Sequence, residues 1–140
     1  MVGITVIIQA FGTSFWIKHL INELSKIRGQ ISNIASMKLL VSTSIFLLVI
    51  NTFQAIIWAV LYYNITDVSE IKTFEEAIYF SLITFTTLGY GDLTMSMDHR
   101  VLSGIEALNG ILLIGWSTTL IYSTVQFVWK RNWKEANKKQ

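Results

Sequence analysis

Charged residues are absent from three long stretches of this sequence, residues 39–66, 77–91 and 107–129. A helix rises by about 1.5 Å per residue, so the first and third stretches can each cross a hydrocarbon core of about 30 Å. The 15 residues of the second stretch are too few to cross as a helix. The sequence therefore predicts an all-α integral membrane protein in which a further apolar segment enters the membrane without crossing it.

The composition agrees with this fold class and excludes several functions. Hydrophobic residues make up 52% of the chain, charged residues 14%, and the mean hydropathy is +0.50. Since there is no cysteine, disulfides, thiolate metal sites and thiol catalysis are excluded. No group of nucleophile, base and orienting residue comes together, so we expect neither an enzyme nor a bound cofactor. The net charge of +2 gives no reason to expect a nucleic-acid partner.

The N-terminal segment leaves two interpretations open. Residues 2–17 are uncharged but make only about 24 Å of helix, slightly short for a span. A helix over residues 1–24 is long enough if Lys18 extends its amine to the interface. The alternative is an amphipathic helix that lies on the membrane surface. We favour the span.

The distribution of basic residues predicts the orientation. The connector, residues 25–38 with Lys18 just ahead of it, carries four basic residues, and the tail, residues 130–140, carries five. The loops on the other side, residues 64–76 and 92–100, carry two. Cytoplasmic loops are enriched in lysine and arginine, so we expect a cytoplasmic connector and tail near lipid headgroups, and an extracellular N-terminus.

The short neutral stretch begins with a helix-start pattern. Thr73-Phe74-Glu75-Glu76 has the form of a capping box, with Thr73 as N-cap and Glu76 reaching back to it. The pattern predicts a helix from Phe74 to about Thr86. Both flanks of this helix lie on the extracellular side, so its C-terminal end points into the membrane and presents the negative end of the helix dipole, which favours a cation.

The residues that follow, Thr87-Leu88-Gly89-Tyr90-Gly91, do not suit a regular helix. Non-helical backbone at membrane depth is tolerated only where protein buries it or where water reaches it. Glycine tolerates positive φ, so Gly89 and Gly91 allow a backbone of alternating handedness that turns successive carbonyls the same way. Carbonyls arranged in this manner can replace the hydration shell of an ion.

The segment "TTLGYGD" resembles the signature of potassium channels, whose selectivity filter has the form T-x-G-Y-G. The stretches "WAVLYY" and "FEEAIYFSLITFTTLGYGDL", followed by "GIEALNGILLIG", are similar to small bacterial channels with a two-transmembrane pore domain. The resemblance covers residues 39–129, and some of these relatives carry an extra N-terminal helix. It implies a homotetramer, because a closed ring of filter loops needs four chains, in a cell membrane, with K⁺ as the permeant ion.

The resemblance also implies roles for individual residues. The potassium sites would be lined by the carbonyls of Thr87, Leu88, Gly89 and Tyr90 with the Thr87 hydroxyl, and Gly91 would shape the outer mouth. The residues expected to support the filter are Thr86, Asp92, Tyr79 and Phe80, the last two as aromatic residues against which Tyr90 would brace. Gly110 lies near the usual gating hinge of the family, although close helix packing would explain it equally well.

Two departures from the family pattern bear on the filter. No proline follows Asp92, and Ile83 stands where some relatives place a glutamate that bonds the filter acid. We therefore expect Asp92 to bond elsewhere, to an aromatic hydroxyl or to water. A weakly selective cation channel and a non-conducting regulatory subunit remain as alternatives.

Glu106 is an ionisable residue inside the last apolar segment, where such a group is costly. It is either a titratable group behind the filter that adjusts gating or a structural hydrogen-bonding residue, and we favour the structural role.

Overall fold

The computed structural model describes residues 1–26, 32–65, 71–97 and 99–137. Within these ranges it has four helices and no strand: α1 (Val2–Lys26), α2 (Asn33–Asn64), α3 (Phe74–Phe85) and α4 (Arg100–Asn137). By length and composition, α1, α2 and α4 can each cross a membrane. The predicted all-α membrane fold is confirmed.

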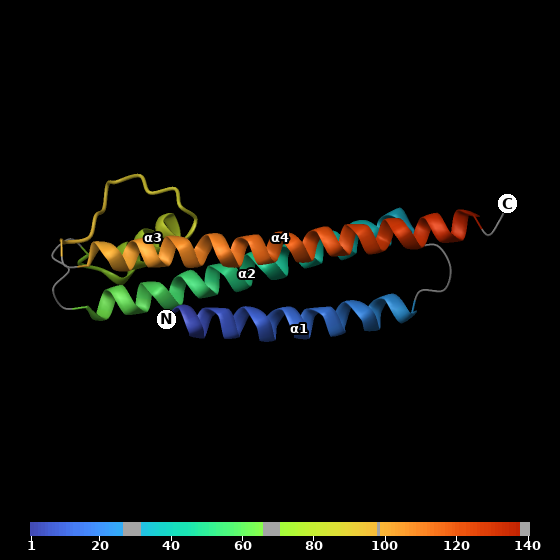
Figure 1. The fold of residues 1–140 in the computed structure, drawn as a ribbon, viewed down its shortest axis with the longest axis horizontal. Coiled ribbons are helices and arrows are strands. Elements are labelled where there is room, and N and C mark those ends of the chain that lie inside the picture. The colour runs from blue at the N-terminus through green and yellow to red at the C-terminus, as the bar shows by residue number, and fades with distance from the viewer. Residues whose placement is uncertain (27–31, 66–70, 98, 138–140) are drawn as a thin grey trace.

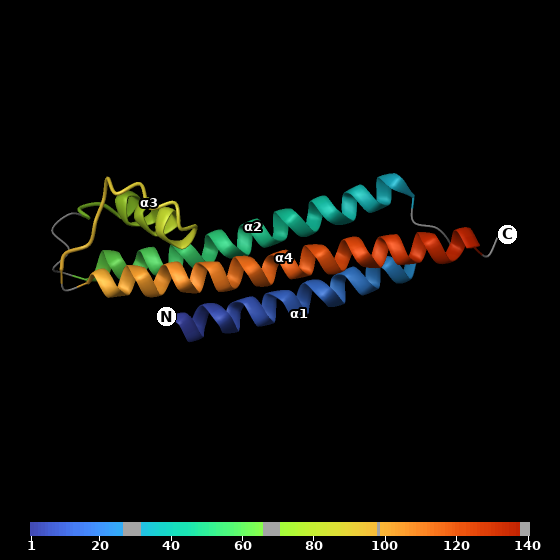
Figure 2. The ribbon, with the colours of Figure 1, turned by 45° about the horizontal axis from the view of Figure 1, so that its top comes forward.

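The three long helices lie side by side along the long axis of the molecule, and α2 runs antiparallel to α1 and α4 (Figures 1 and 2). The short helix α3 packs against α2 and α4 at the end where α4 begins, and the C-terminus lies at the opposite end (Figure 1). Helix α1 packs lengthwise against the other two long helices and is, by length and composition, a candidate membrane span as they are. This packing favours the span over a helix that lies on the membrane surface.

The helices extend beyond the neutral stretches that predicted them. The connector was expected over residues 25–38, but α1 continues through Lys26 and α2 already begins at Asn33. Ser32 caps α2 by accepting a hydrogen bond from the Ala35 amide at 3.2 Å. Toward the C-terminus of the chain, α4 continues to Asn137, well past residue 129, where the third neutral stretch ends. A helix need not stop where charge begins, because its backbone bonds are internal and its polar side chains can lie in water.

The predicted start of α3 is confirmed in detail. Thr73 Oγ1 accepts a hydrogen bond from the Glu76 amide, and a Glu76 carboxylate oxygen accepts one from the Thr73 amide. The same carboxylate accepts a further bond from the Lys72 amide at 2.6 Å. These backbone bonds from Lys72 and Thr73 lower the pKa of Glu76. The capping box thus fixes where the chain turns into α3.

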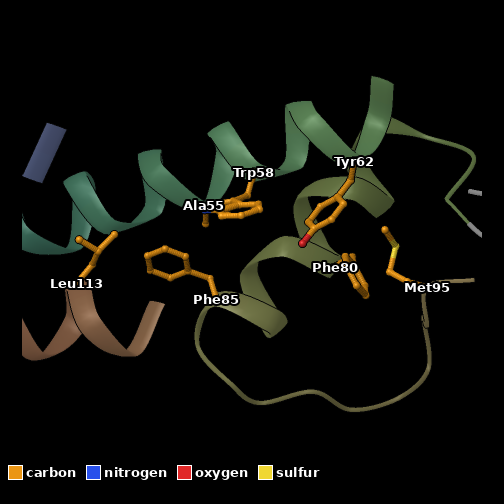
Figure 3. Close-up of a cluster of buried hydrophobic side chains, with 7 residues drawn as sticks. All are labelled: Ala55, Trp58, Tyr62, Phe80, Phe85, Met95 and Leu113. Atoms are coloured by element: carbon orange, nitrogen blue, oxygen red, sulfur yellow. The ribbon is translucent and has the colours of Figure 1, made fainter. Parts of the chain in front are cut away.

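Side chains of α2, α3 and α4 form the core that carries this short helix (Figure 3). The rings of Tyr62 and Phe80 meet edge to face, with centroids 5.1 Å apart. The cluster consists of Ala55, Trp58, Tyr62, Phe80, Phe85, Met95 and Leu113. Large aromatic side chains dominate it, as expected where packing must hold a helix of only 12 residues.

A second contact region joins the three long helices through buried and half-buried polar side chains, which we call the amide network. It comprises Thr5 and Gln9 of α1, Asn51 and Gln54 of α2, and Asn109 and Ser117 of α4. Gln54 Nε2 donates to Gln9 Oε1 at 3.0 Å, and Gln9 Nε2 donates to Ser117 Oγ at 3.0 Å. Interhelical hydrogen bonds of this kind stabilise helix packing in lipid.

Candidate functional site

The residues that follow α3 leave helical geometry in an alternating pattern. Thr86 ends the helix, with its amide bonded to the Leu82 carbonyl. Along residues 87–91, which we call the TLGYG segment, φ is positive at every second residue: 61° at Thr87, 52° at Gly89 and 78° at Gly91. The backbone therefore alternates in handedness, as the two glycines predicted.

The positive φ of Thr87 was not predicted. For a β-branched residue it is an outlier, and strain of this kind costs about 1–3 kcal/mol and is concentrated at functional sites. Hydrogen bonds from the α3 end support it, since the Thr87 amide donates to the Thr84 carbonyl and the Gly89 amide to the Ile83 carbonyl. In the sequence, the only indication of a positive φ at Thr87 is that Thr87 lies two residues before Gly89.

The TLGYG segment is exposed throughout in the single chain, with Leu88 at 59% and Tyr90 at 68% of full exposure. It lies at the start of the looped trace that leaves α3 in Figure 1. Neither Tyr90 nor Gly91 forms a backbone–backbone hydrogen bond within the described part of the chain. Exposed, unpaired backbone next to an apolar helix needs a partner from outside the chain, either another chain, water or an ion.

Asp92 has the aromatic hydroxyl partner that its sequence context led us to expect. The Tyr79 hydroxyl donates to Asp92 Oδ2 at 2.6 Å. This bond holds the pKa of Asp92 below its ordinary value and raises that of Tyr79. Tyr79 thus connects α3 to the residue that directly follows the TLGYG segment.

Replacing Tyr79 by phenylalanine should raise the pKa of Asp92 toward its ordinary value, because the bond to the ionised form is lost. A lowered pKa means that the bond stabilises the protein above the ordinary pKa of aspartate, near 3.9. This contribution is lost as pH falls through the folded-state value. We expect the NMR titration of the Asp92 carboxyl carbon to move to higher pH in Tyr79→Phe.

Tyr63→Phe is the matched control, since the Tyr63 ring packs on Phe74 and not on Asp92. An Asp92 titration that is unchanged in Tyr79→Phe would contradict the assigned bond.

The two aromatic residues expected to brace Tyr90 lie in different surroundings. Phe80 is buried in the aromatic core against Tyr62. Tyr79 lies near enough to Tyr90 for that residue to contribute to its raised pKa, although no ring contact joins Tyr90 to either residue in the part of the chain that the structure describes. Phe80 was assigned by its position in α3, but the helix turns it toward α2.

The two expected gating residues both lie where α4 passes α3. A Cβ atom added to Gly110 would collide with the backbone carbonyl oxygen of Phe85, the last residue of α3. Close packing therefore accounts for this glycine. Glu106 is fully buried one turn earlier, with hydrogen bonds to Ser81 of α3 and Tyr62 of α2. Ser81 and Tyr62 were not recognised in the sequence, since an unremarkable serine and tyrosine carry no signal of this contact.

Three helices long and apolar enough to cross a membrane, with a short capped helix between α2 and α4, are the architecture of a multi-pass membrane protein. Residues 45–127 match a protein family described as "Ion channel". The match takes in α3, the TLGYG segment and most of α2 and α4, and it covers more than half of the chain. The chain belongs to this ion-channel family, and the family implies an oligomeric membrane channel that passes ions.

A relative among curated proteins is "Two-pore potassium channel 4" of Arabidopsis thaliana, which is 29% identical over 107 residues. The alignment covers 74% of this chain and 37% of the plant protein, so the chain spans little more than a third of the length of that relative. No solved structure matches the chain.

Proposed function

We propose that this protein is a potassium-selective channel that conducts K⁺ passively through four TLGYG segments arranged around a common axis. One observation carries the proposal: positive φ at Thr87, Gly89 and Gly91, in an exposed segment at the C-terminal end of a short helix. Alternating handedness lets successive carbonyls face the same way, and a ring of such carbonyls can take the place of water around a cation.

The charge arrangement around the segment supports a cation as the permeant ion. The acidic residues Glu75 and Glu76 lie in the first turn of α3, and the C-terminal end of α3, which carries the negative end of its dipole, precedes Thr87. That the plant relative is a potassium channel by name supports K⁺ over other cations. On this proposal the carbonyls of residues 87–90 and the Thr87 hydroxyl bind the ion.

The homotetramer and its orientation belong to the same proposal. One chain supplies a single TLGYG segment, and all five of its residues are exposed, so a closed ring requires further copies. Residues 39–129 would form the pore domain, with the connector and the C-terminal tail in the cytoplasm and the N-terminus outside. The N-terminus lies toward the end of the long axis where α4 begins and the C-terminus at the other end (Figure 1), an arrangement that supports three crossings.

The test is the reversal potential of the purified, reconstituted protein with K⁺ on one side and Na⁺ on the other. We expect a value close to the potassium equilibrium potential. Robust current with a reversal potential near zero would overturn K⁺ selectivity in favour of a weakly selective cation channel, consistent with the absence of proline after Asp92. If correctly oriented tetramers whose cytoplasmic gate is open carried no current, that result would favour the non-conducting subunit.

A further inference from the structure

The carboxyl group of Glu106 is the meeting point of three helices behind the TLGYG segment. Glu106 has no exposed surface. Its Oε2 accepts a hydrogen bond from the Tyr62 hydroxyl of α2 at 2.6 Å, and its Oε1 lies in short hydrogen-bond contact with Ser81 Oγ of α3. Figure 3 shows Tyr62 extending from α2 toward α3, with its hydroxyl oxygen directed at that helix.

The contacts of Ser81 fix the number of protons in this cluster. Ser81 Oγ lies 2.6 Å from the Ala55 carbonyl oxygen and also contacts Glu106 Oε1. A serine hydroxyl has one proton to donate. If Glu106 were ionised, that proton could serve only one of the two oxygens, and the other would face Ser81 Oγ at hydrogen-bond distance with no proton between them.

A proton on Glu106 removes this conflict. The acid then donates from Oε1 to Ser81 Oγ, Ser81 donates to the Ala55 carbonyl, and Tyr62 donates to Oε2. Every proton in the chain of bonds has one acceptor, and Ser81 acts once as donor and once as acceptor.

Among the described residues, the hydrogen-bond partners of Glu106 give no compensation for a negative charge. Both are neutral hydroxyls: Ser81 from α3, and Tyr62 from α2, which is the titratable group facing it. From α1, the neutral Thr5 bonds to Asn109, three residues after Glu106. On α4, Arg100 lies six residues away in an exposed position. Because Glu106 is buried within one chain, a neighbouring subunit cannot contact it, and an isolated charge at such a site is costly.

We propose that Glu106 is a protonated, neutral carboxylic acid that positions α3, and with it the TLGYG segment, against α2 and α4. The role in positioning rests on the proposed channel function, whereas the proton on Glu106 does not. Ser81 is four residues before the end of α3, so the acid holds the helix about one turn from its C-terminal end, which the TLGYG segment follows. Glu106 acts through Ser81 and does not itself touch the ion.

Infrared spectroscopy of the reconstituted protein at pH 7 tests the proton directly. Exposed carboxyl groups are ionised at this pH, whereas a protonated acid absorbs in its own carbonyl-stretch band above the amide region. We expect this band in the wild-type protein and its loss in Glu106→Gln. Glu75→Gln, which changes an exposed glutamate, is the matched control and should leave the band in place. Loss of carboxylate absorption in Glu106→Gln, with no acid band in the wild type, would overturn the proposal.

Ion selectivity tests the positioning role, because glutamine can imitate the protonated acid but not the carboxylate. Its amide can donate to Ser81 and accept from Tyr62, so Glu106→Gln should keep the wild-type reversal potential. At alkaline pH, where Glu106 ionises, we expect the wild-type protein to lose that potential and Glu106→Gln to keep it. Glu106→Ala removes both bonds and should shift the reversal potential toward zero.

Two outcomes would separate the inference from the proposed function. A reversal potential shifted equally in Glu106→Gln and Glu106→Ala would mean that the negative charge is required, and it would overturn the inference. A wild-type protein that does not select K⁺ would defeat the proposed function and the positioning role with it, while the infrared measurement would still decide the protonation state.

Discussion

Replacing Gly110 by alanine is expected to destabilise the folded chain and to displace α3. The added methyl group would collide with the backbone carbonyl oxygen of Phe85 and lie too close to its carbonyl carbon. Because this neighbour is backbone, it cannot move aside by a change of rotamer. Overpacking of this kind costs about 1–3 kcal/mol per chain. We expect a lower thermal midpoint in detergent and a smaller fraction of assembled oligomer by size-exclusion chromatography.

Gly115→Ala is the matched control for this substitution. Gly115 lies on the same helix, and a Cβ atom there would have no neighbour within 4 Å in the chain. Both changes remove the same flexible residue from α4, so a general need for glycine in this helix predicts equal effects. Close packing against Phe85 predicts that only Gly110→Ala is damaging. Equal thermal midpoints for the two variants would contradict the packing role of Gly110.

Replacing Gly89 by alanine is expected to abolish K⁺-selective conduction while leaving the helices folded. Space is not limiting at this position, since a Cβ atom would meet nothing within 4 Å, but φ is +52°. Holding an L-residue in this conformation costs about 1–2 kcal/mol, and in a tetramer the cost is incurred four times. The segment should relax toward negative φ and turn a carbonyl away from its neighbours. The measurement is the reversal potential between K⁺ and Na⁺.

Gly104→Ala serves as the control here, because its added Cβ would also meet nothing within 4 Å and its φ is not positive. It should conduct as the wild type does. Circular dichroism of Gly89→Ala should show unchanged helix content, which locates the defect in the TLGYG segment. Wild-type selectivity in Gly89→Ala would show that positive φ at this position is not needed for conduction.

The parts of the fold that were predictable from sequence are those set by neighbouring residues. The capping box of Thr73 and Glu76 gave the start of α3, and the short neutral stretch gave its approximate length. Glycines at alternate positions indicated the handedness of the TLGYG segment. Each of these features depends on contacts within a few residues, so the sequence contains the information directly.

The features that could not be predicted depend on contacts between distant segments. The positive φ of Thr87 is supported by the carbonyl of Thr84 at the end of α3, and threonine itself gives no indication of it. Glu106 could be recognised as an unusual residue, but its partners lie 25 and 44 residues away. Helix ends were also misplaced, because the loss of apolar character marks the edge of the hydrocarbon core and not the end of the helix.

The amide network has a consequence for how the chain enters the membrane during synthesis. On its own in lipid, α1 would place Thr5 and Gln9 among acyl chains that offer no hydrogen bonds, whereas in the fold both residues are fully buried against α2 and α4. Their bonding partners Gln54 and Asn109 are translated later than α1 itself. Helix α1 can therefore complete these hydrogen bonds only after α4, which follows it in the chain, has been inserted.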